Sequence, residues 1–132
     1  MNQKHILVVD DDQGARYLLQ QVLEGAGYRV TVAEEGQSAL YAAWSDHPDL
    51  VVTDVAMPVY DGLKTMAMFH GDETLQVPFV VVSGVIDPRR AVALFRAGAR
   101  AFFTKPVDQR LFLAKVAELV SETQPAAAAG PF

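Results

Sequence analysis

The sequence contains no cysteine, which excludes disulfide bonds and thiolate metal sites. It has no run of about 18 apolar residues, so it predicts no membrane-spanning helix. Lysine and arginine form no block either: eleven basic residues face sixteen acidic ones, and the net charge is −5. Because sequence-independent nucleic-acid binding needs clustered basic side chains, we expect this chain to bind neither nucleic acid nor a membrane.

The N-terminal residues also lack the charged-then-apolar pattern of a leader, since an apolar run begins at position 5. We therefore expect a cytoplasmic protein. The 132 residues are 51% hydrophobic and 20% charged, which is typical of one domain with a buried core. We expect that domain to span residues 1–122. Residues 123–132, rich in alanine and proline without periodicity, are expected to form a flexible tail or linker stub.

Short apolar segments alternate about five times with segments of helical periodicity. The expected strands are 5–9, 28–33, 50–52, 77–82 and 101–104. The expected helices carry apolar stripes within 15–26, 39–44, 62–70, 88–98 and 111–120, and these stripes include Leu18, Trp44, Phe95 and Leu111. Asp12 is the expected N-cap of the first helix. The alternation predicts an α/β domain with a parallel sheet covered by helices on both faces.

Polar side chains follow four of the five expected strands at the points where those strands end. They are Asp10 and Asp11, then Asp54, Ser83 and Lys105. Because the carboxyl ends of parallel strands share one edge of a sheet, we expect these residues to lie close together. The sequence therefore predicts a ligand site at this edge, organised around Asp54.

The residue types at this edge favour one kind of chemistry. Three neighbouring carboxylates repel one another, so keeping them ionised requires a cation. Oxygen ligands without cysteine or nearby histidine favour a hard ion such as Mg²⁺. A lysine ammonium and a serine hydroxyl are donors suited to phosphoryl oxygens. Together these groups indicate phosphoryl transfer, with a carboxylate as the candidate nucleophile.

Four motifs resemble those of a known family, the receiver domain of two-component response regulators. They are LVVDDD at 7–12, DVAMPVYDG at 54–62, VSG at 82–84 and TKP at 104–106. The resemblance covers residues 5–122, and the four motifs in this order are highly specific. It implies a flavodoxin-like, doubly wound (βα)5 fold whose five-stranded parallel sheet has the order 2-1-3-4-5.

The resemblance also implies roles for single residues. Asp54 resembles the phosphoacceptor, which takes a phosphoryl group from the phosphohistidine of a sensor histidine kinase or histidine phosphotransfer protein. Asp11 resembles a direct ligand of Mg²⁺ (or Mn²⁺), and Asp10 a ligand through water. Asp54 itself and the backbone carbonyl of Ala56 complete the metal set. Lys105 resembles the ion-pair partner of the phosphoryl group.

Three further positions belong to the implied switch. Ser83 stands where a hydroxyl binds the phosphoryl group, and Phe102 stands at the aromatic switch position of the last strand. The peptide between Lys105 and Pro106 is expected to be cis. Movement of Ser83 and Phe102 would alter the last two helices and the last strand, where an effector protein, an output domain or a second copy would bind.

Two other functions remain open at this point. One is an interaction module that keeps the fold but works without phosphorylation. The other is an aspartyl-phosphate phosphohydrolase, in which a second aspartate commonly stands two residues after the nucleophile. Here Ala56 occupies that position. We therefore expect a self-phosphorylating receiver rather than a turnover enzyme.

The sequence also predicts how long a phosphoryl group would stay on Asp54. In the family, the residues two positions after the phosphoacceptor and after the hydroxyl residue affect hydrolysis. Here they are Ala56 and Val85, whose side chains cannot position water by hydrogen bonding. We predict slow spontaneous loss of phosphate, which is measured by mass spectrometry at intervals after the donor is removed. Loss within seconds from the purified protein contradicts this prediction.

Overall fold

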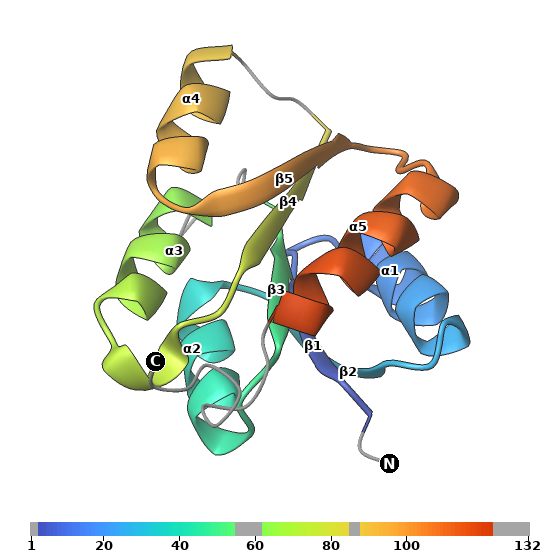
Figure 1. The fold of residues 1–132 in the computed structure, drawn as a ribbon, viewed down its shortest axis with the longest axis horizontal. Helices are drawn as coiled ribbons and strands as arrows, with labels where there is room; N and C mark the ends of the chain where they lie inside the picture. The colour runs from blue at the N-terminus through green and yellow to red at the C-terminus, as the bar shows by residue number, and fades with distance from the viewer. Residues whose placement is uncertain (1–2, 55–61, 85–87, 123–132) are drawn as a thin grey trace.

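The computed structural model describes residues 3–54, 62–84 and 88–122 (Figure 1). The strands are β1 (His5–Val9), β2 (Arg29–Ala33), β3 (Leu50–Thr53), β4 (Phe79–Ser83) and β5 (Ala99–Thr104). The helices are α1 (Gln13–Gly25), α2 (Gly36–Ser45), α3 (Gly62–His70), α4 (Pro88–Arg96) and α5 (Gln109–Glu122), with a short 3₁₀ turn, η1 (Glu73–Leu75). The predicted Ala56 ligand, Val85 and the expected tail lie outside the described residues.

The strands form one parallel sheet in the order β2-β1-β3-β4-β5, which confirms the predicted fold class. β1, β3 and β4 occupy the middle of the sheet, and every residue in these strands is buried. This explains their largely apolar sequences, because a strand covered on both faces buries the side chains of both faces. The polar exceptions, His5, Thr53 and Ser83, stand at the strand ends. The register places Leu7 beside Val51, and Val51 beside Phe79.

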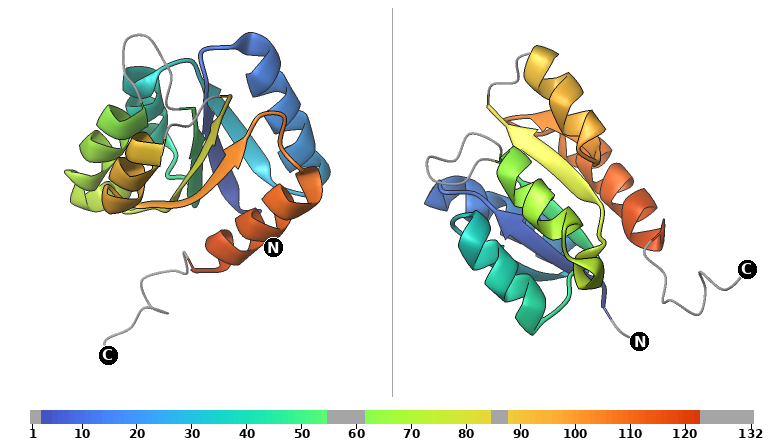
Figure 2. Two further views of the ribbon diagram at one scale, coloured as in Figure 1. Left: turned by 90° about the horizontal axis from the view of Figure 1, so that it is seen from above. Right: turned by 90° about the vertical axis from the view of Figure 1, so that its left-hand side faces the viewer.

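Helices cover both faces of the sheet (Figure 2). α2, α3 and α4 lie on one face, and α1 and α5 on the other. Side chains alternate between the faces along each strand. Leu7 and Val9 of β1 therefore pack into the core under α2, α3 and α4. Ile6 and Val8 pack into the second core, under α1 and α5.

Four large side chains in the predicted helical stripes are more exposed than expected. They are Leu18 (50%), Trp44 (47%), Phe95 (53%) and Leu111 (63%). Each of these side chains lies on a helix that covers one face of the sheet. Such a helix buries a single stripe of residues, and apolar residues at the margin of that stripe stay exposed to solvent. The helices were predicted correctly, but the expectation that Phe95 lies in the inward stripe of its helix was wrong in degree.

The exposed Trp44 has a polar reason for its position. Its indole Nε1–H donates a hydrogen bond of 2.6 Å to the Asp72 carboxylate. Asp72 in turn accepts from the backbone N–H of Thr74 at 2.9 Å and so caps η1, which the sequence analysis did not predict. In the described part of the chain, no helix has the length and apolar character required to cross a membrane.

Candidate functional site

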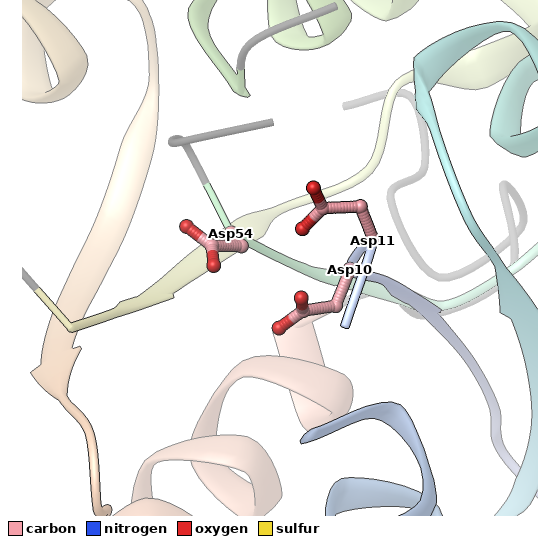
Figure 3. A group of neighbouring side chains, drawn as sticks. All are labelled: Asp10, Asp11 and Asp54. Carbon is pink, nitrogen blue, oxygen red and sulfur yellow. The ribbon is translucent and has the colours of Figure 1, made fainter. Parts of the chain in front are cut away.

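Three aspartates gather at the edge of the sheet where the strands end. Asp10 and Asp11 follow β1, and Asp54 follows β3. One carboxylate oxygen from each lies within 4.8 Å of the others (Figure 3). Asp10 and Asp54 are buried, whereas Asp11 is exposed. The structure thus brings together the three acidic residues that the sequence placed at separate strand ends.

Backbone hydrogen bonds extend the sheet by one residue to hold two of these aspartates. The Asp10 N–H donates to the Ala33 carbonyl of β2 at 3.1 Å. The Asp54 N–H donates to the Val9 carbonyl of β1 at 3.0 Å. Each carboxylate therefore starts from a backbone position fixed by the neighbouring strand, which limits how far the acidic groups can move apart.

The Asp10 carboxylate has a partner at each oxygen. Its Oδ1 accepts from the Asp12 N–H at 2.9 Å, and its Oδ2 accepts from the Lys105 ammonium at 2.7 Å. Asp12 itself caps α1, because its side chain accepts from the Ala15 N–H at 2.8 Å. The predicted cap is thus present, and Asp12 uses its carboxylate for the helix rather than for the acidic group.

Lys105 links two of the acidic residues. Its Nζ lies 2.7 Å from Asp10 Oδ2 and 2.8 Å from Asp54 Oδ2. The backbone N–H of Lys105 donates to the Ser83 carbonyl at 3.0 Å, which continues the pairing of β5 with β4. The peptide bond between Lys105 and Pro106 is cis. The lysine therefore reaches the site from a backbone held against the end of β4.

Burial and charge act in opposite directions on these groups. Burial raises the pKa of Asp10 above its ordinary value, and the charge of Asp54 adds to the rise. The hydrogen bonds from Lys105 and Asp12 offset part of this shift. For Lys105, burial lowers the pKa, but its bonds to Asp10 and Asp54 outweigh burial and leave the pKa raised. The ammonium therefore stays charged at neutral pH.

The residues present fit a hard divalent cation. The acidic group offers carboxylate oxygens alone, which are the ligands that Mg²⁺ prefers. Mg²⁺ also retains several waters, and the exposed Asp11 gives the group a side open to solvent. A cation there would stabilise the ionised form of Asp10, which burial disfavours.

The two predicted switch residues lie on the neighbouring strands. Ser83 ends β4 and is 1% exposed, and it pairs in register with Thr104 of β5. Phe102 lies on β5 and is half-buried against the core under α2, α3 and α4. Its ring contacts that of Phe95 on α4, with centroids 4.5 Å apart. A shift of the Phe102 ring would therefore change its contact with α4 directly.

The role of Arg16, the fourth residue of α1, was not predicted from the sequence. Its guanidinium donates a hydrogen bond of 2.8 Å to the backbone carbonyl of Asp10. The signal available in the sequence was its position near the start of a helix. The helix dipole favours acidic side chains there, so a cation at that end suggests another partner.

With this geometry described, the chain can be compared with known proteins. The family model described as the response regulator receiver domain matches residues 6–117. The chain belongs to this family. It is 38% identical over 127 residues to the response regulator MprA of Mycolicibacterium vanbaalenii, covering 95% of this chain and 54% of that protein. It is 35% identical over 127 residues to the alkaline phosphatase synthesis transcriptional regulatory protein PhoP of Bacillus subtilis, covering 96% of this chain and 52% of that protein.

The receiver domain also resembles solved structures along nearly its whole length. A CheY-like response regulator receiver domain protein of Methanospirillum hungatei matches with a TM-score of 0.85 and 29% identity, covering 92% of this chain and 97% of that one. The signal receiver domain of a histidine kinase from Syntrophus aciditrophicus matches with a TM-score of 0.82 and 30% identity, covering 90% and 91%. The chain spans about half the length of the curated relatives that it matches.

The raised pKa of Asp10 predicts a pH-dependent stability. Folded Asp10 holds its proton more tightly than the unfolded residue, whose pKa is near 3.8. The free energy of unfolding therefore falls as pH rises from that value through the raised folded pKa. Asp10→Asn removes this loss, so without divalent ions the variant should gain stability relative to wild type as pH rises through that range. Urea unfolding at several pH values, followed by Trp44 fluorescence, measures the difference.

Asp46→Asn is the matched control with the opposite sign. The hydrogen bond from Arg29 lowers the pKa of Asp46 and outweighs the effect of burial. Asp46 therefore contributes stability above pH 3.8 that is lost as pH falls through the lowered folded pKa. This variant should lose stability relative to wild type as pH rises. The same direction of change in both variants would contradict the assignment for Asp10.

Proposed function

We propose that this receiver domain is a phosphoacceptor switch in which Asp54 takes a phosphoryl group from a partner's phosphohistidine. The observation that carries the proposal is the position of the Asp54 carboxylate. It lies 2.8 Å from the Lys105 ammonium and within the acidic group formed with Asp10 and Asp11. A buried carboxylate beside a cation and metal-type ligands is suited to nucleophilic phosphoryl transfer.

The proposed reaction forms one bond and breaks another. An Asp54 carboxylate oxygen forms the new O–P bond while the N–P bond of the phosphohistidine breaks, and the bond electrons leave with the imidazole. Bound Mg²⁺ (or Mn²⁺) supplies charge neutralisation for the phosphoryl oxygens. Asp10, Asp11 and Asp54 would hold it, with the Ala56 carbonyl as a further predicted ligand. The Lys105 ammonium, now shared by two carboxylates, is available to a phosphoryl oxygen.

The added charge gives a physical route to partner binding. A phosphoryl group adds about two negative charges and strong acceptor oxygens. We propose that the Ser83 hydroxyl donates to it and that Phe102 shifts in response. Because Phe102 of β5 contacts Phe95 of α4, the shift would change the surface of α4 and β5. A change at α5 stays a prediction from the family resemblance. The proposed partners there are an effector, an output domain or a second copy; the phosphodonor is a sensor histidine kinase or histidine phosphotransfer protein.

The bonds of Lys105 favour this function over the alternatives. An interaction module that works without phosphorylation has no need for a partly buried lysine between two buried carboxylates. This chain lacks the second aspartate that a phosphohydrolase commonly has, because position 56 is alanine. We therefore propose a switch phosphorylated at its own aspartate rather than a turnover enzyme. A cytoplasmic location stays a prediction from the sequence.

The phosphoacceptor assignment is tested by intact mass after incubation with acetyl phosphate. We expect a gain of one phosphoryl group that requires Mg²⁺ and is absent in Asp54→Asn. Lys105→Ala should be phosphorylated about 10²-fold more slowly, because it removes a charge aimed at the reacting oxygens. Lys115→Ala, which removes a partly buried lysine that pairs with Glu118 on α5, is the matched control and should react at the wild-type rate.

A failure with acetyl phosphate is followed by a phosphohistidine protein as donor. No phosphorylation with either donor would contradict the proposed function and favour the interaction module. A gain that persists in Asp54→Asn would contradict the assignment of the acceptor residue.

The switch assignment is tested separately with Phe102→Ala. This variant should be phosphorylated normally, because the Phe102 ring packs against Phe95 of α4 and supplies no polar group to the carboxylates. It should lose most of the phosphorylation-dependent change at α4, read by the exchange of backbone amides in 88–96. A variant that still changes as the wild type does would contradict the role of Phe102, while leaving the phosphoacceptor assignment intact.

A further inference from the structure

Arg16 contacts the acidic site through the backbone. Its side chain is 13% exposed, and its Nη1 donates a 2.8 Å hydrogen bond to the Asp10 carbonyl. This carbonyl belongs to the peptide that joins Asp10 to Asp11. The guanidinium therefore holds the peptide plane between the two neighbouring acidic residues, rather than either carboxylate.

The position of Arg16 is unfavourable for an ordinary surface arginine. It lies near the N-terminus of α1, where the helix dipole disfavours a cation. Its ion pair with Glu34 is long, at 3.7 Å, and Glu34 is 78% exposed. Such a pair contributes little, because solvent screens it. The shorter bond to the Asp10 carbonyl is thus the interaction that accounts for the mostly buried side chain.

Asp10 and Asp11 differ in what fixes them. The Asp10 carboxylate is buried and is held by Lys105 and the Asp12 N–H. The Asp11 side chain is exposed, so packing constrains it less. Figure 3 shows that the two carboxylates leave the end of β1 in different directions. The direction in which Asp11 leaves the chain depends on the peptide plane that Arg16 holds.

We propose that Arg16 is a positioning residue of the metal site, which sets the Asp10–Asp11 peptide so that both carboxylates can serve one Mg²⁺ ion. The inference rests on the proposed function, which places Mg²⁺ at these aspartates. Arg16 would supply no ligand of its own, because its guanidinium donates to the Asp10 backbone carbonyl. It acts as outer partners of metal ligands do, by orienting the ligands.

The sign of the effect distinguishes positioning from charge. Arg16 is a cation near the site, so by charge alone its removal would strengthen the binding of Mg²⁺. If Arg16 orients the ligands, its removal weakens that binding. Arg16→Lys keeps the charge but replaces the planar guanidinium with a point donor on a different stem. A charge effect leaves this variant like the wild type, whereas a positioning role weakens it.

The experiment measures Mg²⁺ binding to the full chain by titration calorimetry, together with the rise in Tm that Mg²⁺ causes. We expect Arg16→Ala to bind Mg²⁺ about tenfold more weakly, the size typical of lost outer partners. Arg16→Lys should also bind more weakly, by a smaller factor. The Mg²⁺-dependent rise in Tm should shrink in the same order, because that rise reports the affinity. A general loss of stability would instead lower Tm equally with and without Mg²⁺.

Arg29→Ala is the matched control. Arg29 is the first residue of β2, so it lies at the N-terminal ends of the strands, whereas the acidic site lies at their C-terminal ends. It pairs with Asp46 at the surface. This variant should bind Mg²⁺ as the wild type does. If Arg16→Ala does not fold, Arg16→Lys decides the question by the same two measurements.

Unchanged or tighter Mg²⁺ binding in the folded Arg16 variants would overturn the inference and leave the proposed function standing. A wild-type protein that binds no Mg²⁺ would contradict the metal part of the proposed function, and the inference with it. Weaker binding in both Arg16 variants, with Arg29→Ala unchanged, supports the inference.

Discussion

The repulsion among three neighbouring carboxylates is the constraint on which this site depends. Two of them are buried, so water does little to screen their charges. The positive charge of Lys105 offsets part of that repulsion, because its ammonium pairs with both Asp10 and Asp54. Burial is the main reason that the pKa of Asp10 is still raised, and the charge of Asp54 adds to the rise. In the proposed function, a cation and the incoming phosphoryl group would relieve this unfavourable charge.

The parallel sheet makes this arrangement possible. Lys105 is 95 residues from Asp10 and 51 from Asp54 along the chain, yet bonds to both. All the strands run in one direction, so their ends meet at the same edge. The backbone bonds at Asp10 and Asp54 extend the sheet into the site. The rigidity of the buried strands is therefore passed to the side chains that carry the chemistry.

Prediction from the sequence succeeded where one strong local rule applied. Continuous apolar runs located the central strands, and Asp12 was recognised as a cap from its place before a helical pattern. It was less successful at the margins of helices. Trp44 and Phe95 fit the helical period, but that period alone does not say how wide the buried stripe is. The width depends on how each helix lies on the sheet.

The sequence by itself determined the order of strands and helices, the residues at the strand ends and the family motifs that they form. These are local features, set by hydrophobic period, turn chemistry and spacing. Tertiary structure decided which atoms meet. Lys105 donates hydrogen bonds to two carboxylates, and Arg16 donates one to a backbone carbonyl. These contacts depend on how distant segments pack together in three dimensions. Every residue has a backbone carbonyl, so the sequence does not indicate which carbonyl accepts a hydrogen bond from Arg16. Only the folded structure shows that it is the carbonyl of Asp10.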